Sequence, residues 1–499
     1  MESLHQMAPL AWQDDRNRRI AELSRGPLDV LIVGGGIVGA GVARDAAMRG
    51  LRVGLVEQCD MAFGTSSRSS RLLHGGLRYL AQGRLGLVYE ASQEKRLLHR
   101  IAPHLADPLA FVFPTYRASA WPLWKLRLGV KVYDLLCGGR NLGPSRALGR
   151  EEVLRYLPMP NADGLTGAVR YYDGLTNDAR LVLDTLRSAA AHGAILCNYV
   201  RFEDAAQVAV GWHCQLRDAL EDRIHELTAR TVVNATGPWA QTLPHSSIRL
   251  RLTKGVHLVI DRRRLPVPDA VVMAEGQRIL FAIPWGERVI LGTTDTDYQG
   301  PLECVAADRA DVEYVLGVGN RAFPAAGLSD SDVLSTWAGL RPLLASKRGG
   351  PSDISRAHEI RCPHAGWLDV AGGKLTTYRR IAQQVVDRVF RYLGRESPPC
   401  RTAAEPLLAP RAAQERSGLL PPPPSPQLVR AYCAEEWAVH LDDVMLRRAG
   451  WHYYHANALS TAEQVGGWMA GLLGWDSAKR DAELARYAAA TVKWRTCEE

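Results

Sequence analysis

The segment Gly34-Gly35-Gly36-Ile37-Val38-Gly39 fits the pattern G-x-G-x-x-G and is the part of the sequence with the clearest chemical meaning. Gly34 permits a tight turn, Gly36 lets the backbone approach a phosphate, and Gly39 allows a helix to pack closely on a strand. Glu57 ends the next apolar run, where a carboxylate can accept hydrogen bonds from ribose hydroxyls. These residues predict a dinucleotide site, although the turn alone does not separate FAD from NAD.

A second segment, residues 64–79, is rich in serine, glycine and arginine. Hydroxyls and backbone N–H groups at this density suit an anion or the edge of a flavin. The same composition also fits a flexible loop that binds nothing. Composition alone leaves both interpretations open.

Hydrophobic periodicity predicts the elements that must position these residues. Residues 29–33 form a compact apolar run typical of a buried parallel strand, 40–49 favour a helix, and 51–56 favour a second strand. This is a β-α-β unit with the glycine turn at the start of its helix. Further helices are expected at about 84–101, 121–136, 178–193 and 375–393, and further strands at 194–199, 231–235, 256–260, 278–283, 288–291 and 368–371.

The composition is that of a globular protein of two to three domains, with 499 residues, 46% hydrophobic and 23% charged. The net charge of +8 favours anionic substrates or anionic lipid surfaces, because no nucleic-acid motif accompanies it. Nine scattered cysteines without a C-x-x-C pair predict neither a metal site nor a disulfide framework, and they suit a reducing cytosol. Neither a signal peptide nor a membrane-spanning helix is expected.

Seven motifs in a fixed order make a family resemblance specific. They are GTSSRSSRLLHGGLRYL at 64–80, VNATGPW at 233–239, KGVH at 254–257, PW at 284–285, GTTD at 292–295, GLRPL at 339–343 and GGKLTTYR at 372–379. Over about residues 28–395 the chain resembles the FAD-dependent (aerobic-type) glycerol-3-phosphate dehydrogenase family. Arg71 departs from the pattern, because the family commonly has lysine there. The C-terminal part resembles the family only loosely, most clearly at 437–454.

The resemblance implies an α/β fold with three parts. They are a Rossmann-like FAD-binding domain of the glutathione-reductase type (DAO-like), a mixed-sheet substrate domain and a helical C-terminal cap. The expected FAD-binding segments are about 28–100, 178–240 and 365–395, and the substrate-domain segments are about 101–177 and 241–364. Composition adds a polar lead-in at 1–27, a Pro-rich linker at 396–427 and a helical C-terminal domain at 428–499.

The implied reaction removes a hydride from C2 of sn-glycerol 3-phosphate to N5 of FAD and yields dihydroxyacetone phosphate. Arg78 and Arg341 are expected to bind the phosphate. His257 is the candidate base for the hydroxyl proton, and Tyr79 the candidate for orienting that hydroxyl. Lys374, at the start of a helix, is expected to stabilise the negative charge of the reduced flavin.

The predicted FAD contacts come from four segments. They are Gly34, Gly36, Gly39 and Glu57; Thr65, Ser66, Ser67, His74, Gly75 and Gly76; Asn234, Thr236 and Gly237; and Gly373, Lys374, Leu375 and Thr376. Asp295 is interpreted as a turn residue and is not assigned to the site.

The resemblance also implies a cytoplasmic protein that passes electrons to a quinone at the inner face of the cytoplasmic membrane, and it leaves room for a homodimer. Residues 121–136 could form a basic amphipathic helix at the lipid interface, or an ordinary packed helix. Three alternatives stay open. They are an oxidase that uses oxygen, a flavin-dependent amine or amino-acid dehydrogenase, and a flavin-binding protein without turnover.

Overall fold

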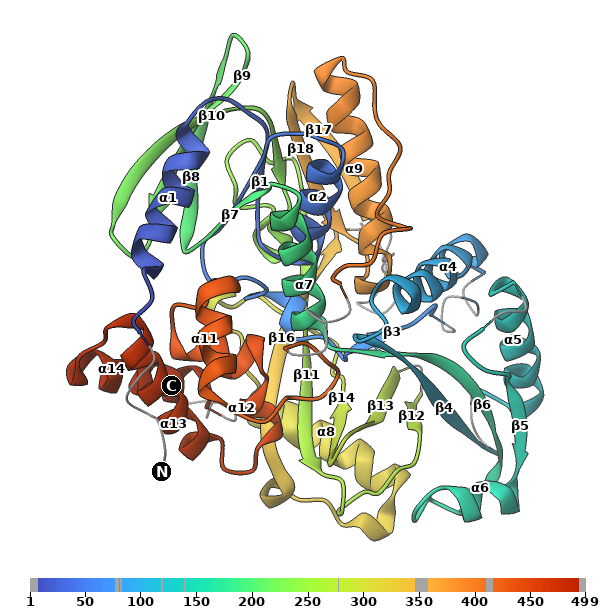
Figure 1. Ribbon diagram of the computed structural model, residues 1–499. Helices are drawn as coiled ribbons and strands as arrows, with labels where there is room; N and C mark the ends of the chain where they lie inside the picture. Colours follow the sequence, from blue (N-terminus) through green and yellow to red (C-terminus); the bar gives the residue numbers. More distant parts are fainter. Residues whose placement is uncertain are drawn as a thin grey trace.

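The computed structural model describes residues 8–492 except 77–79, 81–82, 118–119, 139–140, 277, 346–357 and 410–415. Its described residues form an eight-stranded sheet, a ten-stranded sheet and a group of C-terminal helices beside them (Figure 1). No helix in these ranges is long and apolar enough to cross a membrane.

The first sheet has the strand order β17-β18-β10-β1-β2-β7, and β18, β10, β1, β2 and β7 run parallel. Its central strands are almost entirely apolar because helices or strands cover both of their faces. The bounds are β1 Leu28–Val33, β2 Val53–Glu57, β7 Ile195–Asn198, β8 Val200–Val208, β9 Gly211–Asp218, β10 Arg223–Asn234, β17 His358–His364 and β18 Trp367–Gly372.

Three helices pack together against this sheet: α2 (Ile37–Met48), α7 (Asp178–Ala191) and α9 (Tyr378–Leu393) (Figure 1). Helix α1 (Trp12–Ser24) packs on β7 and β10 through Ile20 and Leu23. The β1-α2-β2 unit is therefore the predicted β-α-β unit, with the glycine turn between β1 and α2.

The second sheet is mixed, because β12 pairs with β4 in parallel while its other pairs are antiparallel. The order is β15-β11-β14-β13-β12-β4-β6-β3, with β16 beside β11 and β5 beside β6. The bounds are β3 Leu72–Leu73, β4 Ala106–Tyr116, β5 Arg146–Gly149, β6 Leu165–Thr176, β11 Leu250–Asp261, β12 Ala270–Glu275, β13 Arg278–Trp285, β14 Arg288–Gly292, β15 Thr296–Asp297 and β16 Val333–Leu344.

Helices cover the second sheet and its edge. Helix α8 (Arg309–Ala322) packs on β11 to β14, and α5 (Leu123–Leu136) and α6 (Arg150–Tyr156) pack on β6. Helix α4 (Leu85–Ile101) lies against α5 and connects this region to the first sheet (Figure 1).

The C-terminal helices pack against helix α7 beside the first sheet and against strand β16 of the second sheet. Their bounds are α11 Pro426–Glu435, η8 Asp443–Arg448, α12 Trp451–Tyr454, α13 Ala458–Leu473 and α14 Ser477–Ala490. The Pro-rich residues before them contain neither helix nor strand in 396–409 and 416–425. They are nevertheless packed, since Arg44 of α2 donates to the carbonyls of Thr402 and Glu405 and Leu407 is buried.

Buried ion pairs connect these helices to the rest of the molecule. Asp60, which follows β2, pairs with both Arg447 and Arg448 of η8. Arg180 of α7 pairs with Glu436 at 2.6 Å. Burial alone would raise the pKa of Asp60, yet the charges of Arg448 and Arg447 lower it below its ordinary value.

The exact domain boundaries stay predictions. Strand β3 belongs to the second sheet although it lies within the expected FAD-binding segment 28–100, and β17 begins at His358, before the expected start at 365.

Candidate functional site

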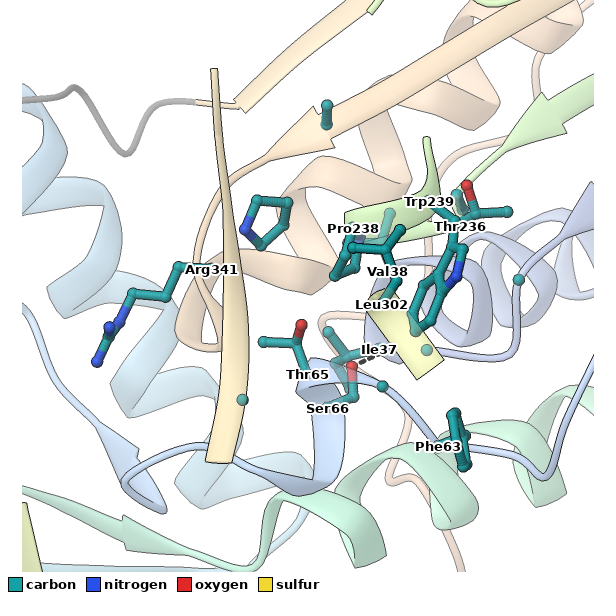
Figure 2. Close-up of a pocket in the computed structure, with 18 of the residues that line it drawn as sticks. Ile37, Val38, Phe63, Thr65, Ser66, Thr236, Pro238, Trp239, Leu302 and Arg341 are labelled. Atoms are coloured by element: carbon teal, nitrogen blue, oxygen red, sulfur yellow. Dashed lines mark hydrogen bonds between the residues drawn. The ribbon is translucent and has the colours of Figure 1, made fainter. Parts of the chain in front are cut away.

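A cavity of about 780 Å³ lies between the two sheets. Its wall is formed on one side by the residues that follow β1, β2 and β10, and on the other by β11 and β16. Figure 2 shows Ile37, Ser66, Trp239 and Arg341 around it. The volume is within the range of pockets that hold small molecules and cofactors.

The glycine turn has the geometry of a phosphate cradle. Gly34 has a φ of +112°, and a Cβ there would lie 2.6 Å from the carbonyl oxygen of Ala235. A Cβ at Gly39 would overlap the carbonyl oxygen of Gly34. Gly36 caps α2, and the N–H of Ile37 donates to Ser66 Oγ at 3.0 Å (Figure 2). The helix therefore presents a backbone N-terminus to the cavity, where an anion is stabilised.

Glu57 lies at the cavity wall and is held by backbone donors. Its Oε2 accepts from the N–H of Gly35 at 2.7 Å, and its Oε1 accepts from the N–H of Cys59 at 2.9 Å. Burial raises the pKa of this carboxyl. The side chain is thus fixed beside the turn, as a ribose-binding acid requires.

The Ser-rich segment is folded and joins the two sheets. Thr65 Oγ1 donates to the carbonyl of Leu340 at 2.5 Å, and Thr65–Ser67 form a single 3₁₀ turn, η1. The N–H of Ser69 donates to Asp178 Oδ2 at 2.8 Å, and Trp337 Nε1 donates to the carbonyl of Ser69 at 3.1 Å. These contacts exclude the interpretation of this part as an unattached loop.

The Gly-Gly-Lys turn after β18 closes the same cavity. Gly373 has a φ of +86°, and a Cβ there would lie 2.5 Å from Ile381 Cδ1. Lys374 lines the cavity and precedes η7 (Leu375–Thr377), which continues into α9. The N–H of His74 donates to Thr376 Oγ1 at 3.2 Å, so the turn is tied to the end of the Ser-rich segment.

His257 lies on β11, between Trp337 on β16 and Gly292 on β14. Its ring stacks on Trp337 with centroids 5.1 Å apart, and its Nε2 lies 2.8 Å from Ser70 Oγ. Only 2% of its surface is exposed. Burial, and then the positive charges of Arg341 and Arg71, lower its pKa to about 3. The imidazole is therefore neutral at ordinary pH, and the same burial and positive charges make it a weak base in this state.

Arg341 projects from β16 beside His257's strand. Its Nη2 donates to Thr293 Oγ1 at 2.9 Å, and its Nη1 lies 3.2 Å from Asp295 Oδ1. The guanidinium fits against Gly255, where any Cβ would collide with it. Asp295, interpreted from sequence as a turn residue, is therefore an ion-pair partner of the proposed phosphate ligand.

Arg71, at the departure from the family pattern, lies in an aromatic cage. Its Cζ is 4.2 Å from the ring centroid of Trp285, 5.2 Å from that of Trp337 and 5.9 Å from that of Tyr453. The residue is 4% exposed, and burial lowers its pKa. Its Nε and Nη1 have no hydrogen-bond partner among the described residues, so stacking is its main interaction there.

The cavity brings together residues from all four predicted segments. The residues on its wall that the sequence predicted are Gly34, Gly36, Glu57, Thr65, Ser66, His74, Thr236, Gly237, His257, Arg341, Gly373, Lys374 and Leu375. Arg78 and Tyr79 lie outside the described residues.

Six predicted cofactor contacts are not among the residues that line the cavity. They are Gly39, Ser67, Gly75, Gly76, Asn234 and Thr376. Gly75, for example, packs against Tyr133, whose hydroxyl accepts its N–H at 3.0 Å. Asn234 is fully buried, and its Oδ1 accepts from Thr236 Oγ1 at 2.7 Å. These residues hold neighbouring parts of the wall in place, and their contact with FAD stays a prediction.

Other wall residues were missed. Ser70 and Arg68 line the cavity, and so does Trp239, whose Nε1 donates to Glu303 Oε1 at 3.2 Å. Ser70, Arg68 and Trp239 belong to quoted motifs, so a signal existed. Glu303 had none, because only the fold brings it there.

The chain is similar to known flavoproteins. The family described as "FAD dependent oxidoreductase" matches residues 29–379. The chain therefore belongs to the FAD-dependent oxidoreductase family, which confirms the predicted fold class and the predicted dependence on FAD.

Within that family the chain groups with the glycerol-3-phosphate dehydrogenases. Glycerol-3-phosphate dehydrogenase 2 of Mycobacterium tuberculosis (strain ATCC 25618 / H37Rv) is 36% identical over 518 residues, covering 92% of this chain and 87% of the relative. The aerobic glycerol-3-phosphate dehydrogenase of Staphylococcus epidermidis (strain ATCC 12228 / FDA PCI 1200) is 38% identical over 379 residues, covering 74% and 68%. The family resemblance found in the motifs is thereby confirmed.

Solved structures of flavoproteins are also similar to this chain. The glycerol-3-phosphate dehydrogenase from Bacillus halodurans complexed with FAD matches with a TM-score of 0.77 at 28% identity, covering 95% of this chain and 97% of that chain. Glycine oxidase from Geobacillus kaustophilus matches with a TM-score of 0.57 at 22% identity, which shows a common fold alone.

Proposed function

We propose that this protein oxidises sn-glycerol 3-phosphate to dihydroxyacetone phosphate with FAD and passes the electrons to a quinone. One observation carries the proposal: the glycine turn, the guanidinium of Arg341 and the neutral ring of His257 line the same cavity. The names of the relatives point to the same substrate.

The residues present fit FAD. The turn needs glycine at Gly34, where a Cβ would strike the backbone of Ala235, and Gly36 leaves the start of α2 open to a pyrophosphate. Glu57 is held beside the turn, where it would accept hydrogen bonds from a ribose. Lys374 and the start of η7 supply positive charge near a flavin ring. When bound, FAD supplies the hydride acceptor, so the protein must bind and orient the substrate and take its hydroxyl proton.

Arg341 suits the phosphate of the substrate. A guanidinium offers two parallel N–H donors to an oxyanion, and Thr293 and Asp295 hold this one in a fixed orientation. His257 lies on the neighbouring strand β11, where it pairs with Trp337 of β16, and its lowered pKa leaves the ring neutral. A base and a cation on adjacent strands match a substrate with a hydroxyl next to a phosphorylated carbon.

The direct test is anaerobic reduction of the bound flavin. The purified holoprotein should show a band near roughly 450 nm that glycerol 3-phosphate bleaches. No bleaching by this substrate would overturn the proposal. Bleaching by an amino acid instead would establish an amino-acid dehydrogenase, and flavin that no substrate reduces would indicate a protein without turnover.

The electron acceptor is proposed to be a quinone because the relatives are named dehydrogenases. After anaerobic reduction, a soluble quinone should reoxidise the flavin much faster than air-saturated buffer does. Rapid formation of hydrogen peroxide under air, at the rate of substrate turnover, would instead establish an oxidase.

Helix α5 supports a peripheral membrane contact, which we propose for the cytoplasmic face. Trp124, Leu128 and Leu135 lie on one side of the helix and are 70%, 62% and 74% exposed. The exposed cations of α5 accompany them: Lys125, Arg127 and Lys131. An apolar stripe flanked by cations suits an anionic lipid interface. The homodimer rests on the family resemblance alone.

Vesicle sedimentation tests this contact. The holoprotein should bind vesicles containing phosphatidylglycerol, and Leu128→Glu should weaken binding without changing flavin reduction in solution. Val492→Glu, at an apolar residue 52% exposed near the end of the described chain, is a matched control. Equal binding of wild type and Leu128→Glu would exclude α5 as the membrane surface.

A further inference from the structure

Ser70 and His257 form a hydrogen-bonded pair at the cavity wall. The Ser70 hydroxyl lies 2.8 Å from Nε2 of His257, and both residues line the cavity that contains Arg341. Ser70 is half-buried, whereas His257 is almost completely buried. The serine hydroxyl is thus the more accessible end of the pair.

The imidazole is held in one orientation. Trp337 stacks on one face, and a Cβ on Gly292 would lie only 2.6 Å from His257 Cδ2, so β14 closes in on its edge. Its Nδ1 is buried and has no hydrogen-bond partner within the described part of the chain. Among the described residues, the Ser70 hydroxyl is therefore the polar group that hydrogen-bonds this ring at the cavity wall.

The segment around Ser70 is clamped on both sides. The backbone of Ser69 is bound by Asp178 and by Trp337, and the N–H of Arg71 donates to Ser69 Oγ at 3.0 Å. Arg71 is fixed in turn by its aromatic cage. A hydroxyl on so rigid a segment needs little reorganisation to transfer a proton.

We propose that Ser70 is a catalytic residue that relays the substrate's hydroxyl proton to His257. Ser70 Oγ takes the proton of the C2 hydroxyl while its own proton moves to His257 Nε2. The C2 carbon loses a hydride, with its electron pair, to FAD, and a C2=O double bond replaces the C–H and O–H bonds. Atoms and charge balance, because the hydride and one proton are all that the alcohol loses.

The charged groups around His257 support this role. Arg341 from β16 and Arg71 from the clamped segment face it, while Asp295 lies beside Arg341 and Asp178 beside Arg71. A bound phosphate dianion would offset the charge of Arg341. The basicity of His257 would then increase only when substrate is present.

Proton inventory of anaerobic flavin reduction tests the relay in the wild-type holoenzyme. This inference rests on the proposed function, so bleaching by glycerol 3-phosphate comes first. Two protons in flight predict that the rate curves downward with the deuterium fraction of the solvent. A straight line would mean that one proton moves, and would overturn the relay.

Variants give an independent result. Ser70→Ala should slow flavin reduction about 100-fold with unchanged FAD content and an unchanged substrate Kd, as expected for loss of an acid–base group. Ser70→Thr, which keeps the hydroxyl, should recover most of the rate. Ser335→Ala is the control, because it removes a buried hydroxyl on β16 that donates to the carbonyl of Tyr453.

The outcomes separate the two proposals. If wild type does not bleach, the proposed function fails. If wild type bleaches and Ser70→Ala bleaches at nearly the same rate, the function stands and the relay fails.

Discussion

Nη1 of Arg341 lies 3.2 Å from Oδ1 of Asp295, so the cation proposed to bind phosphate already has a carboxylate partner. Thr293 accepts a second hydrogen bond from the same guanidinium. Because both partners follow β14, the cation is oriented before any anion arrives. The carboxylate also offsets part of its charge, which limits the strength of anion binding.

Replacing Arg341 with alanine should raise the KM for glycerol 3-phosphate roughly 30- to 150-fold, since a charged hydrogen bond contributes about 2–3 kcal/mol. The FAD content should not change, because the cofactor cradle lies on the first sheet. Steady-state kinetics and the visible spectrum measure both. Wild-type kinetics in Arg341→Ala would refute the phosphate assignment.

Asp295→Asn should lower the KM about fivefold. The amide can still contact the guanidinium, but it removes a negative charge near the incoming phosphate, an effect of about 1 kcal/mol for a partly exposed pair. Inorganic phosphate, tested as a competitor of glycerol 3-phosphate, should inhibit the same variant at a lower concentration. A higher KM would mean that orientation by Asp295 matters more than its charge.

Gly36→Leu should abolish FAD binding. Even a Cβ at this position would lie 3.2 Å from Ser66 Oγ, and a larger side chain would occupy the pyrophosphate cradle. Gly467→Ala in α13 is the control, because nothing lies within 4 Å of its Cβ and alanine favours a helix. The ratio of absorbance at 450 and 280 nm measures the bound flavin. Full FAD content in Gly36→Leu would contradict the cradle.

His257 should make the protein less stable in acid. Its pKa is about 3 in the folded state and about 6.5 when unfolded, so the unfolded chain takes up a proton first as the pH falls below 6.5. Between pH 7 and pH 5 this costs about 2 kcal/mol. Urea unfolding of His257→Gln should show a loss smaller by that amount. Identical pH dependence in the two proteins would mean that the ring is not neutral and buried.

The sequence predicted the parts of the fold that depend on local pattern. The β1-α2-β2 unit follows from an apolar run, a glycine turn and a helix of small residues, all within residues 28–57. Strands β4 and β16 were not predicted, and their sequences contain Pro108, Pro114 and Pro342, which lack a backbone N–H for pairing. Their pairing with distant strands, which local pattern does not encode, outweighs these prolines.

Site residues were predicted where a contiguous motif determines the local geometry, and they were missed where distant segments form the contact. Gly34 and Lys374 belong to glycine-containing turns that are recognisable from the sequence alone. The pairs Ser70–His257 and Arg341–Asp295 depend on the register of β11 with β14 and β16 and on where the Ser-rich segment lies against these strands. A motif does not show which of its members face the cavity, so the contacts of Gly75 and Asn234 with FAD stay predictions.

Asp60→Asn should strongly destabilise the protein although the residue is outside the cavity wall. Asp60 is fully buried between Arg447 and Arg448, and its second oxygen accepts from Arg448 Nη2 at 2.8 Å. Arg447 would keep Asp442 and Asp443, but the buried guanidinium of Arg448 would lose its carboxylate partner, which costs about 3–5 kcal/mol. Thermal unfolding of the holoprotein should show this as a clear drop in Tm.

Glu313→Gln is the matched control for this loss of charge. Its partner is Arg309, one turn away on α8, and both side chains are 59% exposed. An exposed pair of this kind contributes about 0.3–0.5 kcal/mol, so the Tm should hardly change. Equal effects of the two substitutions would mean that the ion pairs of Asp60 contribute no more to stability than an exposed pair. A large effect of Asp60→Asn only would establish that these buried ion pairs fasten the C-terminal helices to the FAD-binding half.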